Sequence, residues 1–380
     1  MSVIVVISGV NLIEGGTLEV FKDCINAFSK KTNVKLICLV NSVSFFDKNY
    51  HEGVQFIEFP DIKRSWLKRL RFEYFSARVL SRKLQADIWF SMHDMSPRVI
   101  AGQQYVYCHN PAPFYKTGVR EFLLDKKFFL FSNFYKYLYR LNIRSNSAVI
   151  VQQGWMVPFF KRLAKKSQVW VARPTSLVRE PQAISSVMEK SPVTELKLFY
   201  PALPRSFKNF EVIFRALEVL SRNKPEHAKK VSVTVTIAGD ENSYARLLKR
   251  EFGGLPNIVW AGRMTRSEVD QCYEQSDVVV FPSRLETWGL PITEAKSHGK
   301  PLLLADLPYA HETLGDYSAA AFFEPTDAGQ LAEQIVRIID GEPVFITAQQ
   351  EPCVADALLN SWEELVERML LASSQSKTVV

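Results

Sequence analysis

Short apolar runs alternate with segments of helical periodicity along the whole chain. Val3–Ser8 is a continuous apolar run that ends at Gly9, and it predicts a buried parallel strand. A helix over Phe21–Phe28 and a second buried strand over Val34–Val40 follow. Further strands are predicted at Asp87–Ser91, Tyr105–Cys108 and Ala148–Gln152. Strands alternating with helices at this spacing predict a parallel sheet that is covered by helices on both faces.

The same pattern starts again after a stretch that contains Pro and Ser. The predicted strands of this second half are Leu196–Tyr200, Val231–Ala238, Asn257–Trp260, Asp277–Phe281 and Pro301–Ala305. The predicted helices are Phe207–Arg222, Tyr244–Phe252, Arg266–Gln275, Leu290–His298 and Ala328–Asp340. A last helix near Ala355–Leu371 carries Trp362 and Leu365 on an apolar face. We expect this helix to pack back toward the first domain.

A chain of 380 residues is long enough for two domains. The pattern assigns them to residues 1–171 and 195–352, with a linker at 172–194 and a C-terminal crossover helix and tail at 353–380. The predicted fold class is α/β, with two facing Rossmann-like domains. Ligands bind such folds at the carboxyl ends of the strands, so motifs that directly follow strands are the candidates for function.

The composition is that of an ordinary soluble globular protein, with 47% hydrophobic and 23% charged residues. The chain start lacks a basic leader before a long apolar stretch, and no window of about 18 apolar residues occurs. The cysteines lie far apart, which argues against a disulfide framework and a zinc cluster: Cys24, Cys38, Cys108, Cys272 and Cys353. We therefore expect a cytosolic protein.

Two glutamates flank the turn that follows the predicted strand Asp277–Phe281. Glu286 lies in the loop and Glu294 on the next helix, with Gly289 and Pro291 between them. A helix start directs its amides at a phosphate or at sugar hydroxyls, and a carboxylate accepts hydrogen bonds from vicinal hydroxyls. The alternative is that both acids only complement the helix dipole.

Three further motifs follow predicted strands. Arg205 and Lys208 precede a helix and form a cationic pair suited to a diphosphate, although a solvated basic loop is the alternative. His109 lies in the loop Tyr107-Cys-His-Asn-Pro-Ala-Pro, where a rigid backbone holds it. Gly15 and Gly16 precede a helix, but the G-x-G-x-x-G spacing of dinucleotide sites is missing.

With Phe281-Pro-Ser ahead of it and Gly299-Lys-Pro behind it, the Glu286-x7-Glu294 pair resembles the signature of the retaining GT-B glycosyltransferases of family 4. These include bacterial mannosyl-, glucosyl- and rhamnosyltransferases of surface polysaccharide assembly. The resemblance covers about residues 200–340 and is weaker in the N-terminal half. It implies that residues 1–171 bind the acceptor and residues 195–352 bind a nucleotide sugar.

The resemblance also assigns roles to single residues. Glu286, His109 and Lys208 are the implied catalytic residues: Glu286 contacts hydroxyls of the donor sugar, His109 contacts the sugar or the β-phosphate, and Lys208 neutralises the diphosphate. Arg205 lies closer to the lysine than the family's usual arginine. The implied donor-binding residues are Glu294, which holds the ribose, and Arg205, Gly15, Gly16, Thr287, Trp288, Gly289, Leu290, Arg263 and Met264.

The implied reaction moves a hexose, with retention, from a nucleoside-diphosphate sugar to a growing and lipid-linked glycan. GDP-mannose, a UDP-sugar or a dTDP-sugar are the candidate donors, and lipopolysaccharide O-antigen is one candidate product. The acceptor would attack on the face of the leaving group. No Asp-x-Asp pair stands in a plausible metal loop, so we expect neither a metal nor another cofactor.

The charge distribution suggests a further partner. Residues 1–165 contain 24 Lys and Arg against 12 Asp and Glu, whereas the remaining residues contain 23 against 28. Basic and aromatic residues interleave in 63–71 and 126–140. Such stretches suit peripheral contact with an anionic membrane, here the inner face of the cell membrane, and a solvated basic face is the alternative. No nucleic-acid-binding motif accompanies them, so no nucleic acid is expected.

Three other functions were weighed. A dehydrogenase would need the G-x-G-x-x-G turn, and a periplasmic sugar-binding protein would need an export signal. A catalytically inactive GT-B scaffold subunit, or a protein that only binds a sugar nucleotide, remains open, although Glu286, Glu294 and Lys208 argue against it.

Overall fold

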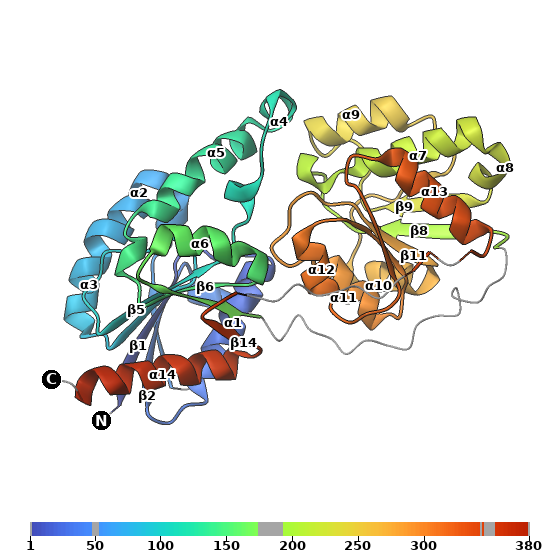
Figure 1. Cartoon of the computed structure of the whole chain (residues 1–380). Helices are drawn as coiled ribbons and strands as arrows, with labels where there is room; N and C mark the ends of the chain where they lie inside the picture. Colours follow the sequence, from blue (N-terminus) through green and yellow to red (C-terminus); the bar gives the residue numbers. More distant parts are fainter. Residues whose placement is uncertain (1, 48–52, 174–192, 343, 346–353, 379–380) are drawn as a thin grey trace. The chain divides into compact units, whose positions relative to one another are not determined.

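The computed structural model describes residues 2–47, 53–173, 193–342, 344–345 and 354–378 (Figure 1). The chain divides into two compact units. The first unit contains residues 1–110, 134–176 and 352–380, and the second contains 111–133 and 177–351. Residues 111–133 therefore group with the second unit, although the sequence assigned them to the first domain. Most of the predicted linker, 172–194, lies outside the described residues.

The first unit is built on a parallel sheet of eight strands in the order β14-β7-β6-β5-β4-β1-β2-β3. Its central strands are entirely buried, as their apolar sequences require. The strand bounds are β1 Val3–Gly9, β2 Val34–Val40, β3 Val54–Glu58, β4 Ile88–Ser91, β5 Gln103–Cys108, β6 Ala148–Val151, β7 Gln168–Ala172 and β14 Ala357–Leu359.

Helices cover both faces of this sheet (Figure 1). They are α1 Gly16–Ser29, α2 Trp66–Arg71, the π-helix η4 Phe72–Ser76, α3 Ala77–Leu84, α5 Lys126–Arg140, the short 3-10 helix η6 Ile143–Ser145, α6 Val157–Ala164 and α14 Trp362–Thr378. Helix α14 packs on α1, and two ion pairs join them: Lys30 with Glu363 and Lys31 with Glu367. The predicted return of the last helix to the first domain is thus observed.

The second unit is built on a parallel sheet of six strands in the order β10-β9-β8-β11-β12-β13. The strands are β8 Leu196–Tyr200, β9 Val231–Val235, β10 Ile258–Trp260, β11 Val278–Phe281, β12 Leu302–Ala305 and β13 Ala320–Phe323. The helices are α4 Val119–Leu124, η10 Ser206–Lys208, α7 Phe210–Asn223, α8 Pro225–Ala228, α9 Ser243–Phe252, α10 Arg266–Gln275, α11 Leu290–Ser297, α12 Pro308–Leu314 and α13 Ala328–Ile339. Apart from α4, these helices again lie on both faces of the sheet (Figure 1).

Two short elements differ from the prediction for local reasons. The segment predicted to begin the last helix at Ala355 first forms β14, which pairs with β7. The helix starts only after Ser361, whose hydroxyl accepts a hydrogen bond from the amide of Glu364 at 3.1 Å. The predicted strand Val231–Ala238 ends at Val235, because the side chain of Glu241 accepts the amides of Ala238 and Gly239 in a turn.

Candidate functional site

The sheet order of each unit has a point at which the connections change direction. In the second unit this point lies between β8 and β11, which are hydrogen-bonded neighbours. The loops that follow these two strands therefore leave the same edge of the sheet side by side. In open α/β sheets ligands bind at such a switch point. The candidate residues Lys208 and Glu286 lie on these two loops.

Lys208 and Glu286 form an ion pair between Nζ and Oε1. Each side chain is only 16% exposed, so water screens the pair poorly. The ammonium also lies above the ring of Phe281, 5.5 Å from its centre. The sequence predicted both residues for the site independently, and the structure brings them together.

The backbone around Lys208 is fixed by buried contacts. The hydroxyl of Tyr200 donates to the carbonyl of Lys208 at 2.6 Å. Asn209 has φ of 59°, in the left-handed region that Asn and Gly adopt most readily. Its buried amide donates to the carbonyls of Pro282, at 3.1 Å, and Pro325, at 2.8 Å. One side chain thus ties the Lys208 loop to the loop that carries Glu286.

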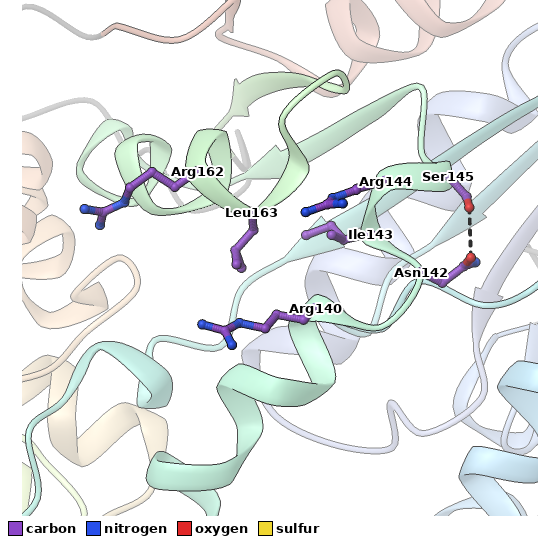
Figure 2. Close-up of a pocket in the computed structure, with 7 residues that line it drawn as sticks. All are labelled: Arg140, Asn142, Ile143, Arg144, Ser145, Arg162 and Leu163. Atoms are coloured by element: carbon purple, nitrogen blue, oxygen red, sulfur yellow. Dashed lines mark hydrogen bonds between the residues drawn. The ribbon is translucent and has the colours of Figure 1, made fainter.

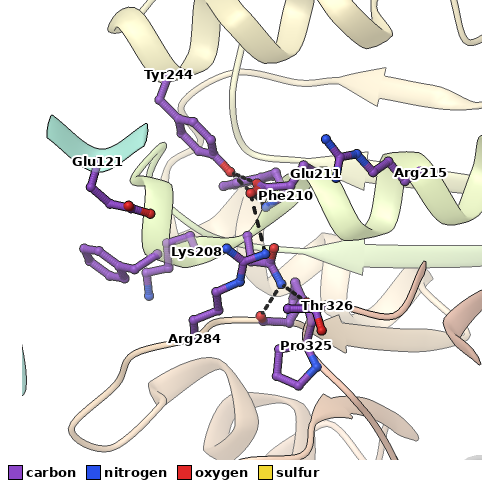
Figure 3. Close-up of polar contacts among 12 residues, drawn as sticks. Glu121, Lys208, Phe210, Glu211, Arg215, Tyr244, Arg284, Pro325 and Thr326 are labelled. Atoms are coloured by element: carbon purple, nitrogen blue, oxygen red, sulfur yellow. Dashed lines mark hydrogen bonds and ion pairs between the residues drawn. The ribbon is translucent and has the colours of Figure 1, made fainter. Parts of the chain in front are cut away.

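A second buried contact supports the start of α7. Glu211 is 1% exposed and accepts the hydroxyl of Tyr244, which itself accepts the amide of Phe210 at 3.1 Å. Arg284, from the Glu286 loop, lies 3.8 Å from Glu211 (Figure 3). Its backbone amide also donates to the carbonyl of Phe207 at 2.7 Å. Sequence reasoning assigned no role to either residue: Glu211 lies outside the matched motif, and Arg284 lies inside it, between Ser283 and Glu286, but was not singled out.

The helix α11 begins as the motif requires. Gly289 has φ of 80°, and a Cβ there would lie 3.2 Å from Ile292 and 3.4 Å from Phe281. Gly289 is therefore needed both for its conformation and for the space. Trp288 is 8% exposed and donates to Thr293, so its ring belongs to the core. Thr287 and Leu290 place their backbone beside this helix start.

Glu294 is held by two residues of α10 that sequence reasoning missed. Arg266 pairs with one carboxylate oxygen, and the hydroxyl of Tyr273 donates to the other at 2.9 Å. Burial, and next the Glu294 carboxylate, raise the pKa of Tyr273 well above its usual range, so this hydroxyl stays a donor. Arg266 also pairs with Asp270 at 2.8 Å. The side chain of Glu294 is 20% exposed.

The other side chains of this unit that were predicted to bind the donor form contacts of their own, although the amide of Lys208 donates to the backbone carbonyl of Arg205 at 2.9 Å. Arg205 is 55% exposed and pairs with Asp125 at 3.3 Å. Arg263 is exposed after β10, and Met264 contacts the thiol of Cys272 at 3.8 Å. The structure shows no contact of these side chains with Lys208, Glu286 or Glu294 among the described residues.

In the first unit the switch point lies between β1 and β4, and β5 is the next strand. His109 follows β5, is 11% exposed, and lies 3.6 Å from Asp94. Asp94 follows β4 and accepts the backbone amides of His109 at 2.7 Å and Asn110 at 3.0 Å. The hydroxyl of Tyr139 donates to the same carboxylate at 3.2 Å. Asp94 therefore fixes the His109 loop, and sequence reasoning missed it because no motif marks it.

The glycine loop after β1 serves two purposes. A Cβ on Gly9 would lie 2.4 Å from the ring of Phe21, so Gly9 is required for packing. Gly15 is the N-cap of α1, with φ of 72° and open space where a Cβ would lie. No side chain caps this helix, which begins at Gly16. Its first amides can therefore bind an anion.

Parts of this chain are similar to known proteins. Residues 186–350 match the family described as "Glycosyl transferases group 1". The D-inositol 3-phosphate glycosyltransferase of Mycolicibacterium smegmatis is 25% identical over 156 residues, which are 39% of this chain and 35% of that protein. The chain thus spans about a third of the length of this curated relative.

Two solved structures share the fold over most or all of this chain. Sucrose-phosphate synthase from Thermosynechococcus elongatus aligns with a TM-score of 0.62 and 13% identity over 100% of both chains. Anabaena HepE, in complex with UDP and glucose, aligns with a TM-score of 0.56 and 13% identity over 89% of this chain and 90% of that chain. At this identity the likeness shows the fold. The predicted α/β class is confirmed: two Rossmann-like domains with parallel sheets, as in GT-B glycosyltransferases.

Proposed function

We propose that this chain is a glycosyltransferase that takes its sugar from a nucleoside-diphosphate donor bound by the second unit. One observation carries the proposal: Lys208 and Glu286 meet at the switch point of the six-stranded sheet, beside the helix start that leads to Glu294. The match of residues 186–350 to glycosyl transferases group 1 supports it. Family 4 and retention of anomeric configuration are part of the proposal.

The Lys208–Glu286 pair gives the two residues separate tasks when a donor binds. A diphosphate brings more negative charge than one carboxylate, so it attracts the Lys208 ammonium and weakens the ion pair. The released Glu286 carboxylate accepts hydrogen bonds from hydroxyls of the donor sugar. Glu294 accepts hydrogen bonds from the ribose hydroxyls, and the backbone of Thr287–Leu290 lines the positions of the sugar and the phosphates. Arg205, Arg263 and Met264 contribute at the diphosphate and the base.

The chemical step needs no metal in this proposal. The acceptor hydroxyl forms a bond to the anomeric carbon on the face that the diphosphate leaves, and the bond from that carbon to the diphosphate oxygen breaks. The acceptor proton passes to that phosphate oxygen. Lys208 and the amides at the start of α11 stabilise the charge that develops on the leaving diphosphate. The sugar therefore keeps its anomeric configuration.

For the first unit we propose acceptor binding. His109, held by Asp94, would contact the transferred sugar or the β-phosphate. Gly15 and Gly16 would offer the first amides of α1 to an anionic group. We further propose that the acceptor is a growing, lipid-linked glycan of bacterial surface polysaccharide, such as O-antigen, and that no nucleic acid takes part.

Because the proposed acceptor is linked to a lipid, we also propose that the chain contacts the inner face of the cell membrane. No helix within the described residues is long and apolar enough to cross a bilayer. In the basic stretch 63–71, Trp66 is 48% exposed and Leu67 is 78% exposed. An aromatic and an aliphatic side chain among basic residues suit a peripheral membrane contact.

A thermal-shift screen against GDP-, UDP-, dTDP- and ADP-sugars tests the donor site. A donor at 100 times its dissociation constant should stabilise the chain by roughly 2.7 kcal/mol. Transfer to an acceptor, with the product's anomeric configuration read by NMR, separates an active enzyme from an inactive scaffold. A donor that stabilises the chain but is neither transferred nor hydrolysed would favour the scaffold, and no stabilisation by any donor would reject the site.

A further inference from the structure

The first unit contains a second concave, positively charged site, which lies away from the carboxyl ends of the strands. A cavity of about 500 Å³ is lined by Arg140 at the end of α5, Arg144 on η6, Arg162 on α6, and Asn142, Ile143, Ser145 and Leu163 (Figure 2). Helix η6 directly precedes β6, and α6 precedes β7. The cavity is therefore at the amino ends of these strands, whereas Gly15 and His109 follow the carboxyl ends of β1 and β5.

The backbone that carries the central arginine is rigid. Asn142 adopts φ of 60° and starts η6, and the hydroxyl of Ser145 donates to its side chain at 2.8 Å (Figure 2). Ile143 is 2% exposed and anchors the turn in the core. Arg144 thus projects from a fixed turn, which lowers the entropy that a ligand contact would cost.

The arginines of the cavity are not neutralised by direct ion pairs within the described part of the chain. Arg140, Arg144 and Arg162 form no ion pair with a carboxylate there, and the guanidinium of Arg140 lies over the ring of Tyr137. Lys165 and Lys166 follow directly after α6 and carry further positive charge close to Arg162 in the sequence. Like charges gathered in this way repel one another, and an anion bound between them removes that repulsion. Guanidinium groups bind phosphate oxygens in a bidentate manner.

An apolar cavity of about 700 Å³ adjoins the same segment. It is lined by Leu67, Leu70, Arg71, Tyr74, Phe75 and Leu141. Leu141 stands between Arg140 and Asn142 in the sequence, so both cavities share this three-residue segment. Leu67 and Phe75 are 78% and 71% exposed and lie at the same apolar cavity, whereas single exposed apolar side chains are scattered on ordinary surfaces. A cavity lined by arginines and an apolar cavity therefore both contact the segment 140–142 of this unit.

We propose that Arg140, Arg144 and Arg162 bind the phosphate of an anionic membrane lipid, while the apolar cavity beside Leu141 takes its hydrocarbon. A soluble phosphate would need only the arginines and would leave the exposed leucine and phenylalanine unexplained. The inference deepens the proposed membrane contact by naming its headgroup site, and it does not depend on sugar transfer.

Flotation with phosphatidylcholine vesicles, with and without phosphatidic acid, tests the site on the full chain. The triple variant R140Q/R144Q/R162Q should lose roughly 100-fold in partitioning onto the anionic vesicles, since each basic residue near an anionic surface changes partitioning about fivefold. The charge-matched control R222Q/K224Q/K230Q, on exposed positions of the second unit, should partition like the unaltered chain. The variant L67Q/F75Q should bind both kinds of vesicle less.

Equal partitioning of the triple variant and the charge-matched control would overturn the proposal, because general charge would then explain binding. A thermal shift with inorganic pyrophosphate that the triple variant loses, without any change in vesicle partitioning, would also overturn it in favour of a soluble ligand. A donor-induced thermal shift in the triple variant equal to that of the unaltered chain shows that the fold and the donor site are intact. Failure here is thus distinguishable from failure of the proposed function.

Discussion

The ammonium of Lys208 lies against the carboxylate of Glu286, although 78 positions separate them in the sequence. Each follows one of two neighbouring strands, β8 and β11, and Asn209 links the two loops through the carbonyl of Pro282. A basic and an acidic group that are partly buried together form a site prepared for a ligand that carries both phosphate and hydroxyls.

Replacing Lys208 with Met should lower kcat by about 10²- to 10³-fold, because the leaving diphosphate loses its cation. Glu286→Gln should weaken binding of the donor sugar, because an amide replaces the carboxylate that accepts hydrogen bonds from the sugar hydroxyls. Since the two residues contact each other, the double variant should lose less than the product of the two single effects. Steady-state transfer rates of the three variants measure this. Lys224→Met, an exposed change in the second unit, is the control, and multiplicative effects would contradict the coupling.

Arg266 is a positioning residue for Glu294 in this account. Arg266→Gln should raise KM for the donor about tenfold with little change in kcat, because the ribose contact forms equally in the ground state and the transition state. Arg266→Lys should restore part of the affinity. Arg250→Gln, at an exposed position of α9, serves as the control. A fall in kcat at unchanged KM would show that Arg266 acts in the chemical step instead.

Replacing Asn209 with alanine should destabilise the chain more than replacing it with glycine, which is the reverse of the usual order in a helix. Both substitutions remove its hydrogen bonds to Pro282 and Pro325, which should cost about 1–3 kcal/mol. Ala should cost about 1 kcal/mol more than Gly, because φ is 59° there. At Arg222 in α7, glycine should instead be the more destabilising. Denaturant unfolding measures both pairs, and an Asn209→Ala variant as stable as Asn209→Gly would contradict the strained conformation.

A buried carboxyl should make the stability pH-dependent. Glu73, in η4, is fully buried, with Arg69 at 4.0 Å and His93 at 3.5 Å. Burial raises the pKa of Glu73 to about 8, although Arg69 opposes the shift. Burial, with Arg69 adding to it, lowers the pKa of His93, so the imidazole is neutral in the folded chain.

The sign of the effect follows from proton counting. Above the unfolded pKa of Glu73 the unfolded chain has lost the proton that the folded chain still holds, so the free energy of unfolding falls as pH rises toward 8. Between the ordinary pKa of His and pH 8, His93 no longer contributes a slope. Glu73→Gln should therefore remove a decline of roughly 1 kcal/mol per pH unit in that window. Denaturant unfolding at several pH values measures this, and an unchanged slope would contradict it.

The sequence predicted those elements whose local pattern is strong. Val34–Val40, Leu196–Tyr200 and Arg266–Gln275 are observed with the predicted bounds. Four strands were missed. Gln168–Ala172 (β7) and Ala320–Phe323 (β13) are mostly buried and were overlooked despite their apolar residues. The edge strands β3 and β14 show no clear apolar run, because Val54–Glu58 is only partly buried and β14 has three residues. Their pairing depends on a neighbouring strand rather than on their own sequence.

The same distinction applies to the residues of the candidate site: some could be predicted from the sequence and others could not. Lys208, Glu286 and Glu294 stand in a motif of fixed spacing, so the sequence alone could single them out. Arg266 and Asp94 could not be found, because they support a predicted residue from another element, 28 positions before Glu294 and 15 before His109. Only the packing of α10 on α11, and of the loops after β4 and β5, brings such partners together.

Calorimetric titration of the full chain with nucleoside diphosphates tests whether Lys208 forms part of a donor site. We predict that at least one of UDP, GDP, dTDP and ADP binds, and that Lys208→Met weakens this binding at least about tenfold, or 1.4 kcal/mol, while affinity for the matching nucleoside stays the same. No binding of any of the four, or equal affinity of the unaltered chain and the Lys208→Met variant for the diphosphate, would contradict a donor site built around Lys208.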